Sequence, residues 1–196
     1  APPHATPTSA PPSISTIRQV AASARYRPGN ILPVTSCADD GSNGTLRSVV
    51  VGAISGDTVD LSALTCSTIT LTQGAIAVDV DDLSMQGPGA ASLTIDGANA
   101  NRVIAHHGYG TLAISDVTVA YGRYISAHTS VPSPGGCVYS AGSVALTDAT
   151  VSHCLAGQIT PTVRFAPGGG IYAAGDLTLV GSTISDSTAL GNFSEG

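Results

Sequence analysis

The sequence contains no lysine and no tryptophan, and few of its residues carry a charge. All seven basic residues are arginine, thirteen residues are acidic, and charged residues make up 10% of the chain. With a net charge of −6 the chain offers no basic surface for a phosphate backbone, which argues against a nucleic-acid partner. Aromatic residues amount to only 4%, so the composition excludes a bulky aromatic core and favours many short, regularly stacked strands.

No apolar run approaches the roughly 20 residues that a membrane-spanning helix requires. The first residues, APPHATPTSAPPS, lack the basic start and apolar stretch of a secretory signal. Such signals are cleaved after small residues, so Ala1 fits the first residue left after cleavage. We expect residues 1–30, rich in Pro, Ala, Ser and Thr, to form a flexible arm before a single domain at 31–196.

Four cysteines in a lysine-free chain rich in Ser, Thr and Gly favour two disulfides and an oxidising compartment. Four free, buried thiols in a cytosolic protein are the alternative. The first reading predicts a secreted or cell-surface protein.

A repeat dominates the second half of the chain. GGCVYSAGSVALTDATVSHCLA, from Gly135, returns as GGGIYAAGDLTLVGSTISDSTA from Gly168, an offset of 33 residues. A fainter copy, GYGTLAISDVTVAYG, begins at Gly108, at an offset of 32. A period of this length is typical of stacked repeat architectures.

Each unit holds very short strands rather than helices. In Val144–Ala145–Leu146 and Leu177–Thr178–Leu179, apolar residues alternate with small or polar ones, which marks a strand with one buried face. Three such triplets per unit, separated by turns, form a coil that stacks on the next about 4.8 Å away. The sequence therefore predicts an all-β fold, a right-handed parallel β-helix of about four coils at 67–196. The last of these coils is incomplete.

A capping segment is expected at residues 31–66. TLRSVVVGAISG places Leu46, Val49, Val50 and Ile54 on one helical face, and Gly56 follows as a stop signal. An amphipathic helix at the start of a coil stack covers the apolar end of the first coil.

These residues resemble a family. TLRSVVVGAISGDTVDLS, CSTITLTQG, LSMQGPGAASLTIDG and the GGGIY repeats look like the bacterial extracellular right-handed parallel β-helix proteins called choice-of-anchor Q domain proteins. Those are similar in turn to polymorphic outer-membrane proteins. The resemblance covers Val34 to about Asn192 and implies a secreted or surface-exposed repeat protein. It transfers no catalytic residue.

The coil positions predict how the cysteines pair. Cys137 opens the third strand of one coil and Cys154 closes the second strand of the next, so both flank the corner where a long loop leaves the stack. A bridge there would restrict the unfolded chain by roughly 3 kcal/mol. Cys37 and Cys66 would similarly fasten the cap to the first coil.

The chemistry-bearing residues form no convincing catalytic set. VDVDDLS offers Asp79, Asp81 and Asp82 as calcium ligands or an acid–base pair, but the alternation with valine favours solvated turn residues. His106 and His107, adjacent on a strand end, should point in opposite directions, which argues against a shared metal. No catalytic triad spacing or phosphate loop is present, so we expect no cofactor and no catalysis.

Two further features remain as candidate sites. Asp116 and Asp148 occupy equivalent turns of adjacent coils, as a weak cation site or as turn residues. The loops at 120–136 and 155–169 leave the same corner and could bind a carbohydrate or a surface protein, or fold back over the stack. Their candidate binding residues are Tyr121, Arg123, Tyr124, His128, Arg164 and Phe165.

The chain's end suggests a function. After Leu177–Leu179 and Ser182–Ile184 a third strand should follow, but the sequence continues as GNFSEG, so the last coil would leave an apolar end and a pairing edge exposed. We therefore expect a structural, adhesive or self-assembling, fibre-like protein that associates through this coil. The alternative is a fragment of a carbohydrate-active enzyme, a polysaccharide lyase or glycoside hydrolase, or a glycan-binding module.

Overall fold

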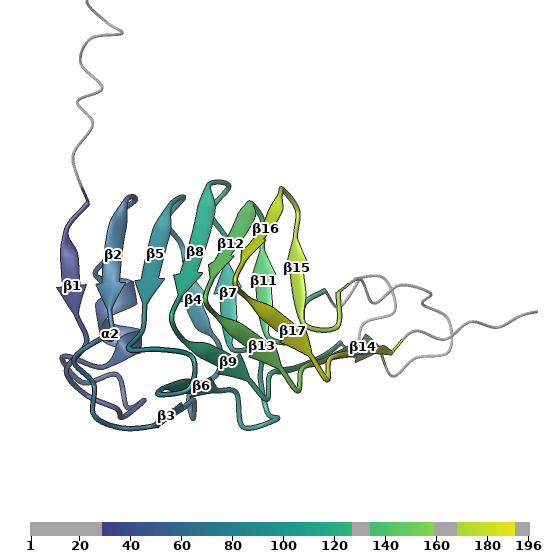
Figure 1. Cartoon of the computed structure of the whole chain (residues 1–196), viewed down its shortest axis with the longest axis horizontal. Coiled ribbons are helices and arrows are strands. Elements are labelled where there is room, and N and C mark those ends of the chain that lie inside the picture. The colour runs from purple at the N-terminus through teal and green to yellow at the C-terminus, as the bar shows by residue number, and fades with distance from the viewer. Residues whose placement is uncertain (1–28, 127–133, 159–167, 191–196) are drawn as a thin grey trace, which may run out of the picture.

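A computed structural model describes residues 29–126, 134–158 and 168–190 of the chain, and the arm predicted at 1–30 lies almost entirely outside them. The described chain is nearly all β, and its strands stack into a parallel β-helix, as the repeat predicts (Figure 1). Every strand pair within it is parallel.

Three sheets form the walls of the β-helix. The six-stranded sheet contains, in order, β1 (Ile31–Pro33), β2 (Asp57–Asp60), β5 (Leu83–Gln86), β8 (Thr111–Ser115), β12 (Ser143–Thr147) and β16 (Leu177–Val180). The five-stranded sheet contains β3 (Thr68–Thr70), β6 (Thr94–Asp96), β9 (Thr118–Ala120), β13 (Thr150–Ser152) and β17 (Thr183–Ser185). The four-stranded sheet contains β4 (Ile76–Val78), β7 (Ile104–His106), β11 (Val138–Ser140) and β15 (Ile171–Ala173).

Along the chain, the strands of the three walls follow one another in a fixed order. The triplets β2–β3–β4, β5–β6–β7, β8–β9–β11 and β12–β13–β15 each complete a coil, and β16 and β17 begin another. The strand register follows the sequence repeat, since Val138 pairs with Ile171 and Val144 with Leu177, both 33 residues apart.

The core is a stack of aliphatic side chains, one row per wall. In the five-stranded sheet the middle residue of each strand points inward, and Ile69, Ile95, Val119 and Val151 are all fully buried. Threonines flank these residues on the outer face, for example Thr68 beside Ile69. The period-2 pattern therefore works as predicted, even over strands of only three residues.

Turn residues between walls are set by backbone geometry. Asp116, Asp148 and Gly181 follow β8, β12 and β16, and their φ angles of 55°, 48° and 58° lie in the left-handed region. Glycine and aspartate tolerate this region better than most residues. The repeated aspartates are therefore explained by the turn they make.

The predicted capping helix exists but is shorter than expected. Helix α2 (Leu46–Val51) begins at the N-cap Thr45, buries Leu46 and Val50 against the core, and ends at Gly52. The expectation that Ile54 lies on the helical face is wrong, because the chain has left the helix by then and Ile54 is 48% exposed. Its N–H instead donates to the Asp57 carboxylate, which turns the chain into β2.

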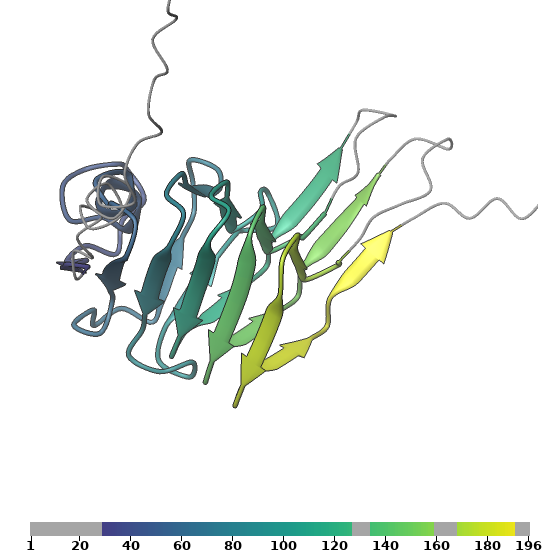
Figure 2. The same ribbon diagram turned by 90° about the horizontal axis from the view of Figure 1, so that it is seen from above.

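The sequence analysis missed three strands, two of which lie in the predicted long loops. β10 (Arg123–Ser126), β14 (Leu155–Gln158) and β18 (Thr188–Leu190) form a three-stranded parallel sheet, called the side sheet below. Figure 2 shows these strands, coloured teal, green and yellow, beside the main stack. In two coils the side-sheet strand, β10 or β14, thus lies between the five-stranded and four-stranded walls, and β18 follows β17 in the last described coil.

Candidate binding surfaces

The acidic segment after β4 is solvated and occupied by local contacts. The Asp79 side chain is 77% exposed and lies 2.7 Å from Nδ1 of His107, which is itself 54% exposed. The carboxylates of Asp81 and Asp82 accept the backbone N–H groups of residues 109 and 111, at 3.0 and 2.8 Å. All three carboxylates therefore make contacts with the corner that follows β7, in line with the interpretation as solvated turn residues.

Within the described residues, no group of three or more His, Cys, Asp or Glu side chains is placed to hold a metal ion. Asp116 and Asp148 do occupy equivalent corners, as expected. The Asp148 carboxylate leans toward Gly181, the equivalent residue of the next coil, where a Cβ would collide with its Oδ1. This column of turns shows no ligand set of the kind a cation needs.

The two adjacent histidines point in opposite directions, as predicted. His106 is fully buried, with Nδ1 2.7 Å from the Ser140 hydroxyl and Nε2 3.0 Å from the carbonyls of both Val80 and Asp81. Because Nε2 faces two carbonyl oxygens, it carries the proton, and Nδ1 is free to accept the hydroxyl proton. His106 thus fastens together three successive coils and has no access to a substrate.

Of the proposed binding residues of the loops, the structure describes Tyr121, Arg123 and Tyr124, and these three have different surroundings. Tyr121 stacks on His153 at 4.9 Å between ring centroids, on the outer corner that follows β9 and β13. Arg123 is exposed and begins β10. His128, Arg164 and Phe165 lie outside the described residues.

Tyr124 faces a cluster that the sequence analysis did not anticipate. The Arg102 guanidinium lies 3.9 Å from the centre of the Tyr124 ring and 5.1 Å from that of Tyr139. Tyr139 in turn stacks on Tyr172, one coil later, at 5.7 Å. Burial lowers the pKa of the Arg102 guanidinium, while the two tyrosines nearest to it act in the opposite direction. The 33-residue spacing of Tyr139 and Tyr172 is visible in the sequence repeat. No sequence pattern places Arg102 beside these tyrosines.

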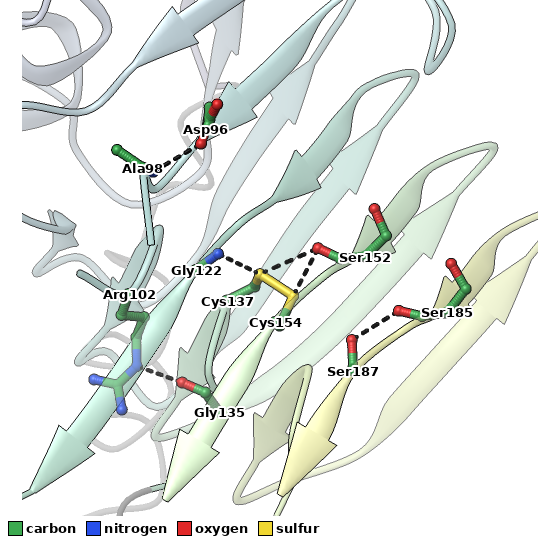
Figure 3. Close-up of a disulfide and its surroundings, with 10 residues drawn as sticks. All are labelled: Asp96, Ala98, Arg102, Gly122, Gly135, Cys137, Ser152, Cys154, Ser185 and Ser187. Atoms are coloured by element: carbon green, nitrogen blue, oxygen red, sulfur yellow. Dashed lines mark hydrogen bonds between the residues drawn. A yellow bond between two sulfur atoms is a disulfide. The ribbon is translucent and has the colours of Figure 1, made fainter. Parts of the chain in front are cut away.

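Arg102 also holds the chain that leads into β11. Its Nε donates to the carbonyl of Gly135 at 2.8 Å (Figure 3). Its Nη2 donates to the carbonyl of Pro134. The side chain therefore connects the side sheet, through Tyr124, to the four-stranded wall. This is a positioning role rather than an open ligand site.

Both predicted disulfides are confirmed, Cys37 with Cys66 and Cys137 with Cys154. The second is buried and joins the residue before β11 to the residue before β14, at the root of the side sheet (Figure 3). One coil later Ser187 stands where the second cysteine would be, and its hydroxyl donates to the Ser185 carbonyl at 2.9 Å.

A shallow trough crosses the outer face of the six-stranded sheet, with a volume of about 430 Å³. Its lining combines hydroxyl, amide and aliphatic side chains with one carboxylate and has no aromatic ring. Its lining residues are Thr58, Ser84, Met85, Gln86, Ala113, Ile114, Ser115, Asp116, Ala145 and Thr147. A single carboxylate at its edge provides no acid–base pair for glycoside hydrolysis.

The last described coil exposes residues at core positions. Leu177 and Leu179 in β16 are each 43% exposed, whereas their register partners Val144 and Leu146 in β12 are 1% and 0% exposed. The same contrast holds in the five-stranded sheet, with Ile184 at 40% exposure. The described strands of this coil therefore expose apolar side chains, and we call them the open coil (β16, β17 and β18).

Comparison of the chain with protein-family models, with curated proteins and with solved structures finds no match. Among the described residues there is no helix long and apolar enough to cross a membrane.

Proposed function

We propose that this chain is a non-catalytic structural or adhesive module that works outside the cell and associates through its open coil. The exposure of Leu177, Leu179 and Ile184 carries this proposal. These side chains occupy the inward face of their strands, where the preceding coil buries its equivalents completely. Contiguous apolar surface of this kind marks an interaction site.

Three observations support a role without catalysis. The three aspartates of VDVDDLS are engaged by turns or by His107, and His106 is sealed in the wall. The trough on the six-stranded sheet lacks a second carboxylate. The alternative, a carbohydrate-active enzyme, requires a pair of groups that could work together on one bond.

An extracellular setting fits the two disulfides, since such bonds form and persist in oxidising compartments. The resemblance to secreted β-helix proteins of bacteria points the same way. Secretion and surface attachment are therefore part of the proposal.

The test is the mass of the non-reduced chain in solution, measured by light scattering over a wide concentration range. We expect the mass to rise with concentration for the parent chain. Ile184→Asp, which places a charge on the open coil, should prevent the rise, whereas Val51→Asp should not, because Val51 is 79% exposed on α2. A constant monomer mass, together with cleavage of acidic polysaccharides that Asp79→Asn abolishes, would support the enzyme instead.

A further inference from the structure

We infer that the partner of the open coil is the open coil of a second copy, arranged about a two-fold axis. This inference rests on the proposed function and specifies its partner. It differs from head-to-tail growth, in which the open coil of one copy would meet the opposite end of the next. The two ends of the β-helix are built differently, and that difference decides between the two arrangements.

At the opposite end, two positions on the outer edge of β1 and the residues that follow it, Pro33 and Thr35, have no N–H free to pair with another strand. Thr58 N donates to Asn30 O, and Val34 N donates to Asp60 O, so the even-numbered residues of β1 bond to β2. In a parallel pair alternate residues serve the two sides, so the odd-numbered residues face outward. Of these, Pro33 has no N–H and the Thr35 N–H already donates to Gly44 O at 2.9 Å. Proline at such an edge is a known protection against strand addition.

The core is covered at the same end. Helix α2 buries Leu46 and Val50, and Val34 and Val59 beside it are fully buried. The capping segment is tied down by Arg47, which pairs with Asp39 and donates to the carbonyls of Gly74 and Ala75. This end therefore presents neither an apolar coil nor a full row of donors to the open coil of another copy.

The open coil presents both an apolar surface and a row of backbone groups at a free edge. Val144 N donates to Asp176 O, and Asp148 N donates to Val180 O, so the even-numbered residues of β16 bond to β12. Leu177 and Leu179 consequently direct their N–H and C=O groups to the free edge, and their half-exposed side chains lie beside them. An edge of this composition is self-complementary, because two antiparallel copies of it can exchange hydrogen bonds and bury the same leucines.

A second copy brings a ready-made coil of matching shape and register, and an isologous contact of this type closes at two chains.

The test is sedimentation velocity of the non-reduced full chain across concentrations, with one variant at each end. We expect the mass to level off at twice the 19.4 kDa of one chain. Leu179→Asp should weaken the association at least about tenfold, and Ile31→Asp, at a 71% exposed position of β1, should leave it unchanged. Leu177→Asn serves as a second open-coil variant, and circular dichroism checks that each variant folds.

The outcomes separate the two claims. Growth beyond two chains, or a loss of association in Ile31→Asp, would overturn the two-fold arrangement but leave association through the open coil intact. A monomer at every concentration, or a dimer that Leu179→Asp and Leu177→Asn do not affect, would overturn both.

Discussion

The buried carboxylate of Asp39 and the partly buried guanidinium of Arg47 form a two-pronged ion pair that holds the capping segment to the first coil. Arg47 Nε lies 2.8 Å from Asp39 Oδ1, and Nη2 lies 3.0 Å from Oδ2. The same carboxylate accepts the backbone N–H groups of Thr72 and Gln73, at 2.7 and 3.0 Å. With its side chain 1% exposed, Asp39 has its charge fully compensated by these four donors.

Removing this carboxylate should destabilise the protein strongly. Asp39→Ala leaves the Arg47 guanidinium and two amides without their acceptor, so we expect the free energy of unfolding to fall by about 3 kcal/mol. Urea unfolding followed by circular dichroism measures the change. Asp40→Ala is the matched control, since Asp40 is the adjacent, exposed aspartate, and it should cost much less. Equal losses for the two variants would contradict the role assigned to Asp39.

The same carboxylate should make stability depend on pH in the acid range. Burial alone would raise the pKa of Asp39, but hydrogen bonds from Arg47, Gln73 and Thr72 outweigh it and hold the pKa below the ordinary value of 3.8. The pair therefore contributes its full stabilisation above about pH 4, and the contribution is lost as the pH falls through the lowered pKa.

The urea concentration at the midpoint of unfolding, measured from about pH 5 down to pH 2, reports this loss of stability. This midpoint should fall less with decreasing pH in Asp39→Ala than in the parent chain. Hydrogen bonds from the backbone of Ile54 and Asn30 also lower the pKa of Asp57, so part of the decline should remain in the variant. An identical decline in both proteins would mean that Asp39 is not a principal acid-sensitive group.

The disulfide between Cys137 and Cys154 should stabilise the side sheet and the fold together. It closes a segment with a sequence separation of 17 residues, for which chain entropy gives about 3 kcal/mol. The double variant Cys137→Ala/Cys154→Ala should lose about that much stability in urea. Hydrogen exchange should accelerate first in β14, which starts at the residue after Cys154. Unchanged exchange in β14 would contradict this coupling.

Arg102 and Tyr124 should be energetically coupled. A partly buried guanidinium 3.9 Å from a ring centre contributes about 1 kcal/mol beyond its hydrogen bonds. A double-mutant cycle with Arg102→Met and Tyr124→Leu measures this coupling through urea unfolding. Arg123→Met is the control, since Arg123 is the exposed neighbour of Tyr124 and should show no coupling to Arg102. Additive losses in the first cycle would exclude the stacking role.

The coils could be predicted from the sequence because each core position repeats and carries its own signal. The alternation around Leu146 and Leu179 fixes which face is buried, and the 33-residue offset fixes the register. The disulfide pairs followed from the same coil positions. In each case a local sequence pattern was enough to predict which residue of the adjacent coil lies next to a given residue.

The side sheet could not be predicted in this way. Its register pairs Arg123 with Leu155 and Leu155 with Thr188, three dissimilar residues, so no shared side chain marks the strand. These strands exist through pairing between coils rather than through a periodic buried face. The Asp39–Arg47 pair was missed for a related reason, because the amides that complete it lie 33 and 34 residues away.

The most direct measurement is amide hydrogen exchange of Leu177 and Leu179 at low and high protein concentration. If the open coil is the association surface, these two amides exchange rapidly in dilute solution and become protected as the chain associates. The Thr178 amide, which faces β12, should stay protected in both conditions. Equally rapid exchange of Leu177 and Leu179 in an associated sample would contradict the account, because the association would then use another surface.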